Sequence, residues 1–119
     1  MRRVMLKSKV HNARVKETNI EYQGSLTLDE TLMKEADMAP FEQIHVYNIS
    51  NGERFITYLI KGERDSGIVG INGAAARKAK VGDRLIIASY GIMEEDESDF
   101  YMPRIVIVDE DNRIKEISS

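Results

Sequence analysis

The sequence predicts a mainly β protein, folded as a small closed or nearly closed barrel with two short helices. Short runs rich in β-branched and aromatic residues recur along the chain, turn residues separate them, and only two segments have helical character. The 119 residues suffice for one compact core but leave no room for a cofactor domain beside a substrate domain. We therefore expect residues 1–119 to form a single domain.

The strands are predicted from alternating or continuous apolar runs bounded by turn residues. They cover residues 4–10, 13–20, 43–49, 53–61, 67–71, 83–90 and 104–108, with a short terminal strand over 113–117. Between the third and fourth runs lies Asn51-Gly52, which is a strong hairpin signal. Asp111-Asn112 predicts the turn that leads into the terminal strand.

Two segments are predicted to be helical. Asp29 can cap a helix that runs to about Met38, because the apolar residues of this segment fall on one face and Pro40 ends it. The second helix is the alanine-rich segment 74–79. The acidic run 94–99 is predicted to be a solvated loop, because like charges repel and resist packing.

Composition narrows the classes of function. The net charge of −3 argues against nucleic-acid binding, for which a basic surface is expected. No apolar run in the sequence is long enough to cross a membrane. The N-terminus has no apolar segment typical of a secretion signal, and the lack of cysteine suits a cytoplasmic protein. Basic residues cluster between Arg2 and Lys16, either as a solvated strand face or as contributors to a site for an anionic substrate.

The common catalytic motifs are missing from the sequence. His11 and His45 lack the spacing of a metal-binding pair, so no metal site is predicted. There is no phosphate-binding glycine loop and no Gly-x-Ser-x-Gly nucleophile motif. The remaining candidate is Gly24-Ser25, between a predicted strand and the first helix.

Gly24-Ser25 has two interpretations. In the first it is an ordinary turn, in which Gly24 supplies a positive φ and Ser25 starts a strand. In the second, the Ser25 hydroxyl attacks the Gly24 carbonyl, the chain breaks by β-elimination, and hydrolysis leaves a pyruvoyl group on the new N-terminus. Glycine favours the second route because its backbone reaches conformations closed to other residues.

Five sequence blocks distinguish these interpretations. They are Met5-Leu6-Lys7-Ser8-Lys9-Val10-His11, Tyr22-Gln23-Gly24-Ser25, Asn51-Gly52-Glu53-Arg54-Phe55-Ile56-Thr57-Tyr58, Asn72-Gly73-Ala74-Ala75-Ala76 and Val81-Gly82-Asp83. In their order and spacing they resemble the pyruvoyl-dependent aspartate 1-decarboxylases of bacterial pantothenate synthesis, over roughly residues 1–93. The resemblance implies a double-psi β-barrel, a homotetramer, and cleavage into a β-chain (1–24) and an α-chain (25–119).

The resemblance also implies roles for individual residues. Gly24 and Ser25 form the cleavage site, and Ser25 becomes the pyruvoyl group that forms a Schiff base with L-aspartate. Tyr58 is the implied proton donor. The implied substrate-binding residues are Lys9, Arg54, Thr57, Gly73, Ala74 and Ala75. The residues with less certain roles at the site are His11, Asn72 and Tyr22.

These residue types suit the implied chemistry. A pyruvoyl group is an electron sink for decarboxylation, a tyrosine hydroxyl can protonate carbon, and an arginine matches a carboxylate with two hydrogen bonds. Plainer interpretations also exist: Thr57 and Tyr58 as sheet surface, Asn72-Gly73 as a helix cap, and Glu53 with Arg54 as an exposed pair. Thr57 and Tyr58 are adjacent, so both can line one site only through a twist, a bulge or backbone contact.

Some positions depart from the family pattern. Gln23 stands where an acidic or apolar residue is frequent, Tyr47 where tryptophan is common, and the C-terminal quarter matches least. The competing functions are a pyruvoyl decarboxylase that prefers glutamate and a non-catalytic barrel that binds a ligand. One methylene is worth only about 1–3 kcal/mol of discrimination, so both acidic substrates fit the pattern. Cleavage without help and cleavage with a helper protein are both compatible with these residues.

Overall fold

The computed structural model describes residues 1–118, which form nine strands, two α-helices and one 3₁₀-helix. The elements are β1 (Arg2–Arg14), β2 (Glu17–Asn19), β3 (Ser25–Asp29), α1 (Glu30–Glu35), β4 (Gln43–Asn48), β5 (Arg54–Gly62), β6 (Val69–Asn72), η1 (Gly73–Arg77), β7 (Arg84–Glu94), α2 (Glu95–Ser98), β8 (Arg104–Val108) and β9 (Ile114–Ser118). The predicted mainly β architecture is confirmed. No helix within residues 1–118 is long and apolar enough to cross a membrane.

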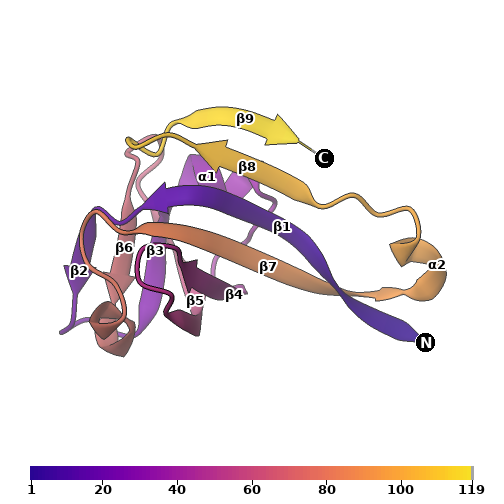
Figure 1. The fold of residues 1–119 in the computed structure, drawn as a ribbon, viewed down its shortest axis with the longest axis horizontal. Helices are drawn as coiled ribbons and strands as arrows, with labels where there is room; N and C mark the ends of the chain where they lie inside the picture. Colours follow the sequence, from indigo (N-terminus) through magenta and orange to yellow (C-terminus); the bar gives the residue numbers. More distant parts are fainter. Residues whose placement is uncertain (119) are drawn as a thin grey trace.

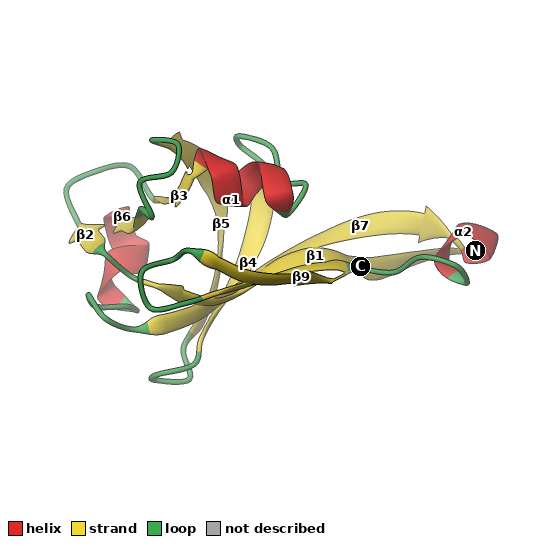
Figure 2. Ribbon diagram, turned by 90° about the horizontal axis from the view of Figure 1, so that it is seen from above, coloured by secondary structure: helices red, strands yellow, loops and turns green. Residues whose placement is uncertain are grey.

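All nine strands belong to one strongly curved sheet in the order β2-β6-β3-β5-β4-β7-β1-β8-β9 (Figures 1 and 2). Strands β1 and β2 follow each other in the chain but lie far apart in this order, because β1 pairs with β7 and β2 pairs with β6. The short connection between them therefore brings the two ends of the sheet together. Two backbone hydrogen bonds fix the passage, from Val15 N to Asp83 O and from Lys16 N to Val69 O, both 2.9 Å long. The sheet therefore curls around a single core.

The core shows the two-residue period of strands that are buried on one face. Val10 pairs with Ile87 on one side and Val106 on the other, and Ile87 also pairs with Val46. All four side chains are fully buried. Because neighbouring residues point to opposite faces, Lys9 and His11 lie on the outer face of β1.

The predicted break between strands 4–10 and 13–20 is wrong. Instead β1 continues through His11 and Asn12 to Arg14, and only residues 17–19 form the separate strand β2. The two residues left between the predicted strands lie at a β-bulge, where the register with β7 shifts between His11 and Ala13 and Asn12 has a φ of 69°. A bulge inserts one residue into a strand without ending it.

The helices also differ in detail from the prediction. Helix α1 is shorter than expected, and Asp29 caps it by accepting a hydrogen bond from Thr31 N at 2.8 Å. The alanine-rich segment forms the 3₁₀-helix η1. The acidic run was predicted as a loop, but Glu95–Ser98 form one turn of helix closed by reciprocal bonds between Glu94 and Glu97.

The N-terminal half of β1 and the C-terminal half of β7 project from the barrel as a two-stranded ribbon with α2 at its tip (Figures 1 and 2). Val4 and Ile92 are paired across this ribbon, and their side chains are 70% and 66% exposed. Cross-strand apolar pairs stabilise a ribbon, but this one leaves apolar surface in contact with water.

Candidate active site

Ser25 is the first residue of β3 and is fully buried. It pairs with Asn72 of β6, and the Asn72 side-chain amide donates hydrogen bonds of 3.0 Å to the hydroxyls of both Ser25 and Thr27. The Ser25 hydroxyl donates in turn to the carbonyl of Gln23 at 3.0 Å. The Ser25 hydroxyl is therefore held in place at the point where the turn enters the sheet.

Two glycines pack against each other at this turn. Gly73 has a φ of +67°, and a Cβ atom on it would lie 2.5 Å from Gly24 N and 2.6 Å from Gly24 Cα. Only glycine fits here, because both its φ and its close approach exclude a side chain. Gly24 itself does not have a positive φ, so that part of the turn interpretation is wrong, while the strand that starts at Ser25 is confirmed.

A cavity of about 450 Å³ opens beside Gly24, and we call it the cleavage-site cavity. Its lining residues are Gly24, Phe55, Ile56, Thr57, Tyr58, Ala74, Ala75 and Lys78. The structure thus brings together five residues predicted from the sequence, which are Gly24, Thr57, Tyr58, Ala74 and Ala75. They come from the turn before β3, from β5 and from η1.

The pairing of β5 explains how Thr57 and Tyr58 line the same cavity. Residues 54–58 pair with β4 without a register shift, whereas the ladder to β3 begins only at Leu59 opposite Leu26. Within the described chain, this part of β5 therefore has a partner strand on one side only. The unpaired edge of β5 lies beside Gly24, so the cavity contacts the consecutive residues Thr57 and Tyr58 along this edge. A bulge in β5 is therefore not needed for both residues to line the cavity.

Lys78 is a cavity residue that the sequence interpretation missed. It follows η1, and its carbonyl accepts hydrogen bonds from the side-chain amides of Asn48 at 3.1 Å and Asn51 at 3.0 Å. Buried Asp83 accepts from the same Asn48 amide at 2.9 Å, which ties η1 to the start of β7. The only signal in the sequence was a lysine within the Ala-rich segment 74–79; in the structure its Nζ lies 3.7 Å from a carboxylate oxygen of Glu53.

Arg54 begins β5 and lies opposite Tyr47 of β4. Its guanidinium carbon is 4.9 Å from the centre of the Tyr47 ring, a cation–π contact, and the Tyr47 and Tyr90 hydroxyls are 2.7 Å apart. The bond to Tyr47, together with burial, raises the pKa of Tyr90 to about 12. Tyr47 thus contacts Arg54 in the position where tryptophan is common in the family.

The other predicted site residues have different locations. Tyr22 is half-exposed in the turn before Gly24, and Asn72 reaches Ser25 directly. Lys9 and His11 do not line the cleavage-site cavity; they lie on β1, which pairs with β7 and β8. Burial lowers the pKa of His11, and the positive charges of Lys9 and Arg84 lower it further.

Comparison with known proteins assigns the chain to a family. The family model described as aspartate decarboxylase matches residues 1–115. The chain belongs to the aspartate decarboxylase family. Among its relatives, aspartate 1-decarboxylase of Bordetella avium is 51% identical, over 98% of this chain and 96% of that protein. Aspartate 1-decarboxylase of Syntrophobacter fumaroxidans is 56% identical, over 95% and 91%.

The fold agrees with that of a solved double-psi β-barrel. The rationally designed mkDPBB_sym_86 protein aligns with a TM-score of 0.50 over 71% of this chain and 91% of its own, at 16% identity. So low an identity is evidence about the fold alone. For this member of the aspartate decarboxylase family, the double-psi β-barrel expected from the sequence is confirmed.

Proposed function

We propose that this chain cleaves itself between Gly24 and Ser25 and then decarboxylates L-aspartate to β-alanine and CO2, with a pyruvoyl group derived from Ser25. The observation that carries the proposal is the location of Ser25. It is a fully buried serine, hydrogen-bonded to Asn72, and directly follows a glycine that lines a cavity. The family membership and the names of the relatives support the same reaction.

Self-cleavage would use the Ser25 hydroxyl and the peptide bond that directly precedes it. The Ser25 oxygen bonds to the Gly24 carbonyl carbon as the Gly24–Ser25 C–N bond breaks, which leaves an ester and a free amine. Loss of the Ser25 α-proton then expels Gly24 as a carboxylate and leaves dehydroalanine. Water hydrolyses this group to a pyruvoyl group and ammonia. Asn72 holds the Ser25 hydroxyl at 3.0 Å, and it remains a donor to that oxygen as the oxygen becomes the nucleophile.

The surroundings of Ser25 fit the pyruvoyl group. Ser25 directly follows Gly24, which lines the cleavage-site cavity together with Thr57, Tyr58 and Ala74, so the proposed cleavage would create the new N-terminus beside this cavity. The group supplies an electrophilic carbonyl that takes up the electron pair released when CO2 leaves. The cavity of about 450 Å³ is large enough for a small dicarboxylic acid.

Residues that line the cavity, together with neighbouring Gly73 and Arg54, then bind the substrate and move one proton. Thr57 and the backbone of Gly73, Ala74 and Ala75 bind aspartate, and Tyr58 delivers a proton to the carbon that has lost CO2. Arg54 pairs with a substrate carboxylate through two hydrogen bonds. Its contact with Tyr47 limits the positions of the guanidinium before the substrate arrives.

The assembly we propose is a homotetramer. Lys9 and His11 lie on the outer face of β1 and do not line the cleavage-site cavity of their own chain. In the tetramer we expect them to line the cavity of a neighbouring copy. The exposed apolar pair Val4 and Ile92 on the projecting ribbon supports contact between copies. Light scattering of the purified protein should give four times the mass of the chain.

The test of the function combines intact mass with substrate trapping. The purified protein should separate under denaturing conditions into fragments 1–24 and 25–119. Borohydride added with aspartate should increase the mass of the 25–119 fragment only, and added pyridoxal phosphate should not change the activity. A single uncleaved chain without β-alanine production would contradict unaided self-cleavage and favour a zymogen or a non-catalytic barrel. Turnover of glutamate faster than aspartate would contradict the assigned substrate.

A further inference from the structure

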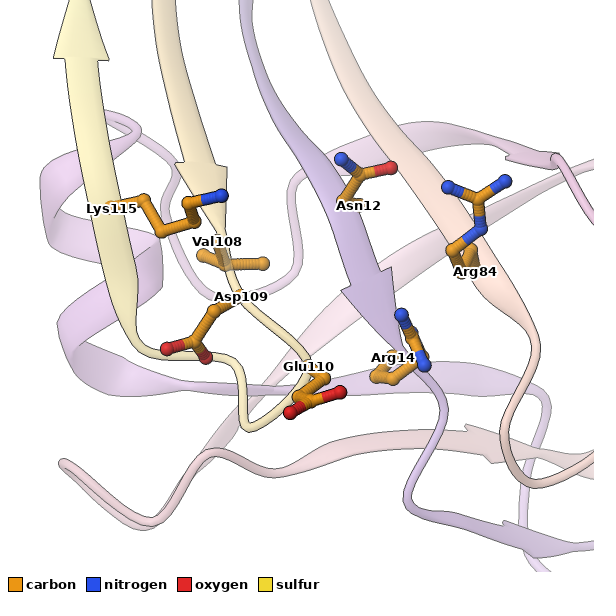
Figure 3. Close-up of a pocket in the computed structure, with 7 residues that line it drawn as sticks. All are labelled: Asn12, Arg14, Arg84, Val108, Asp109, Glu110 and Lys115. Atoms are coloured by element: carbon orange, nitrogen blue, oxygen red, sulfur yellow. The ribbon is translucent and has the colours of Figure 1, made fainter.

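A second cavity, of about 340 Å³, lies where the ends of β1 and β7 meet the β8–β9 hairpin (Figure 3). We call it the cationic cavity. Its lining residues are Asn12, Arg14, Arg84, Val108, Asp109, Glu110 and Lys115. None of them lines the cleavage-site cavity, and none belongs to the residues assigned above to cleavage or turnover.

Three positive side chains of this cavity lack a carboxylate partner. Arg14 and Arg84 are directly opposite each other in the β1–β7 ladder, an arrangement in which like charges destabilise a sheet. Lys115 extends from β9 toward β8 and β1 (Figure 3). Among residues 1–118, none of the ion pairs involves these three residues. The repulsion is therefore not relieved by the described part of the protein.

The two acidic residues of the cavity offset this charge only in part, because three positive residues and two acidic residues line it. One carboxylate oxygen of Asp109 accepts hydrogen bonds from the backbone of Asp111 and Arg113, each 2.9 Å long, within its own turn. The bond from the Arg113 backbone is the largest cause that lowers the pKa of Asp109, and the charges of Arg113 and Lys115 also lower it. Glu110 also lines the cavity, and its backbone carbonyl accepts a hydrogen bond from Lys16 Nζ at 2.9 Å.

Two buried polar atoms at the cavity also lack partners. Asn12 Oδ1 and Arg14 Nε are shielded from solvent and make no hydrogen bond within the described residues. Most buried polar atoms in proteins are paired, because an unpaired one loses its hydrogen bonds to water without replacement. Asn12 lies at the bulge of β1, and bulges frequently re-aim a side chain at a binding site.

We propose that the cationic cavity is a binding site for a phosphate group, separate from the cleavage-site cavity. Two arginine forks and one ammonium supply more donors than the two oxygens of a carboxylate can accept, whereas a phosphate offers three or four oxygens. A bound phosphate would also relieve the repulsion between Arg14 and Arg84. The volume of about 340 Å³ accommodates inorganic phosphate or the phosphate end of a small metabolite.

The test is calorimetric titration of the full-length protein with sodium phosphate at constant ionic strength, with acetate as the comparison anion. Phosphate should bind, and acetate should bind at least tenfold more weakly. Arg14→Gln and Arg84→Gln should each weaken phosphate binding about 10–100-fold, because each removes charge-assisted hydrogen bonds. Titration with glycerol 3-phosphate then separates the two sources of the group: tighter binding than inorganic phosphate indicates a phosphate ester.

Three further variants control for fold and location. Lys115→Gln changes an exposed residue and should weaken binding without affecting the melting temperature. Arg64→Gln removes an exposed positive charge outside the cavity and should leave phosphate binding unchanged. Arg54→Gln should also leave it unchanged, although it impairs the proposed decarboxylation. The proposal therefore stands or falls independently of the proposed reaction.

Several results would overturn this site. One is the lack of phosphate binding by the folded wild-type protein. Another is phosphate binding that is abolished by Arg54→Gln but not by Arg84→Gln, which would place the anion in the cleavage-site cavity. A third is a smaller oligomer formed by Arg84→Gln, combined with no phosphate binding by the wild-type protein. In that case the positive charges meet a carboxylate of a neighbouring copy.

Discussion

The two cavities of this barrel differ in how their polar groups are satisfied. At the cleavage-site cavity, the hydroxyls of Ser25 and Thr27 are hydrogen-bonded to Asn72. At the cationic cavity, Arg14 and Arg84 are paired across the β1–β7 ladder, and two buried polar atoms make no hydrogen bond within the described residues. A satisfied network holds reacting groups in one geometry, whereas unsatisfied charge is stabilised by a ligand. The first region is thus organised for reaction within the chain, and the second for binding.

Ser25→Ala gives the largest expected effect. Alanine has no hydroxyl to attack the Gly24 carbonyl, so the chain should stay whole and β-alanine production should be lost entirely. The barrel should still fold, because the substitution removes one buried oxygen. Phosphate binding at the cationic cavity should be retained, which would show that the two regions act separately. Mass spectrometry and calorimetry of the same preparation measure both outcomes, and cleavage after residue 24 in this variant would exclude the route.

Tyr58→Phe and Thr57→Val separate the residues needed for chain cleavage from those needed for decarboxylation. Phenylalanine keeps the ring but removes the proton donor, so cleavage should proceed while turnover falls about 10²–10⁴-fold. Thr57→Val should instead slow cleavage if the threonine hydroxyl, which lines the same cavity as Gly24, polarises the Gly24 carbonyl. Fragment formation and β-alanine production are compared in both variants. Normal turnover by cleaved Tyr58→Phe would transfer the proton-donor role to water or to another hydroxyl.

Gly73→Ala tests the contact between the two glycines. An added Cβ at 2.5 Å from Gly24 N must displace the turn, and the φ of +67° adds strain of about 1–3 kcal/mol. We expect slower cleavage and a lower melting temperature. Gly82→Ala is the matched control, because its φ of +95° is also unfavourable but a Cβ there meets no atom within 4 Å. Equal effects on cleavage in the two variants would show that the contact with Gly24 is unimportant.

The local sequence predicted strands better than it predicted their continuity and contacts. The hairpin at Asn51-Gly52 follows from two residues, and the blocks around Ser25 and Tyr58 identified most of the cleavage-site cavity. The bulge at Asn12 was not predictable from the local sequence. An asparagine between two apolar runs is as typical of a turn as of a bulge, and only the pairing of both flanking segments with β7 distinguishes them. Lys78 was missed because distant Asn48 fixes its position.

The smallest expected effect concerns His11, which lies near the cationic cavity. Burial and the charges of Lys9 and Arg84 lower its pKa, so the folded protein binds a proton less readily than the unfolded chain. The contribution of His11 to stability is therefore complete above the unfolded pKa of about 6.5 and decreases as the pH falls toward the lowered folded value. His11→Asn should flatten the dependence of the melting temperature on pH between about 7 and 5.

Phosphate provides the sharper form of this test. A phosphate bound between Arg14 and Arg84 offsets the positive charge that disfavours the His11 imidazolium, so the pKa of His11 should rise when phosphate is added. Proton resonances of His11, assigned by their loss in His11→Asn, report this pKa directly. In Arg84→Gln the pKa should already be higher, and phosphate should change it less. A pKa of His11 that is insensitive to both phosphate and Arg84→Gln would disconnect it from the cationic cavity and leave burial as the main cause of its shift.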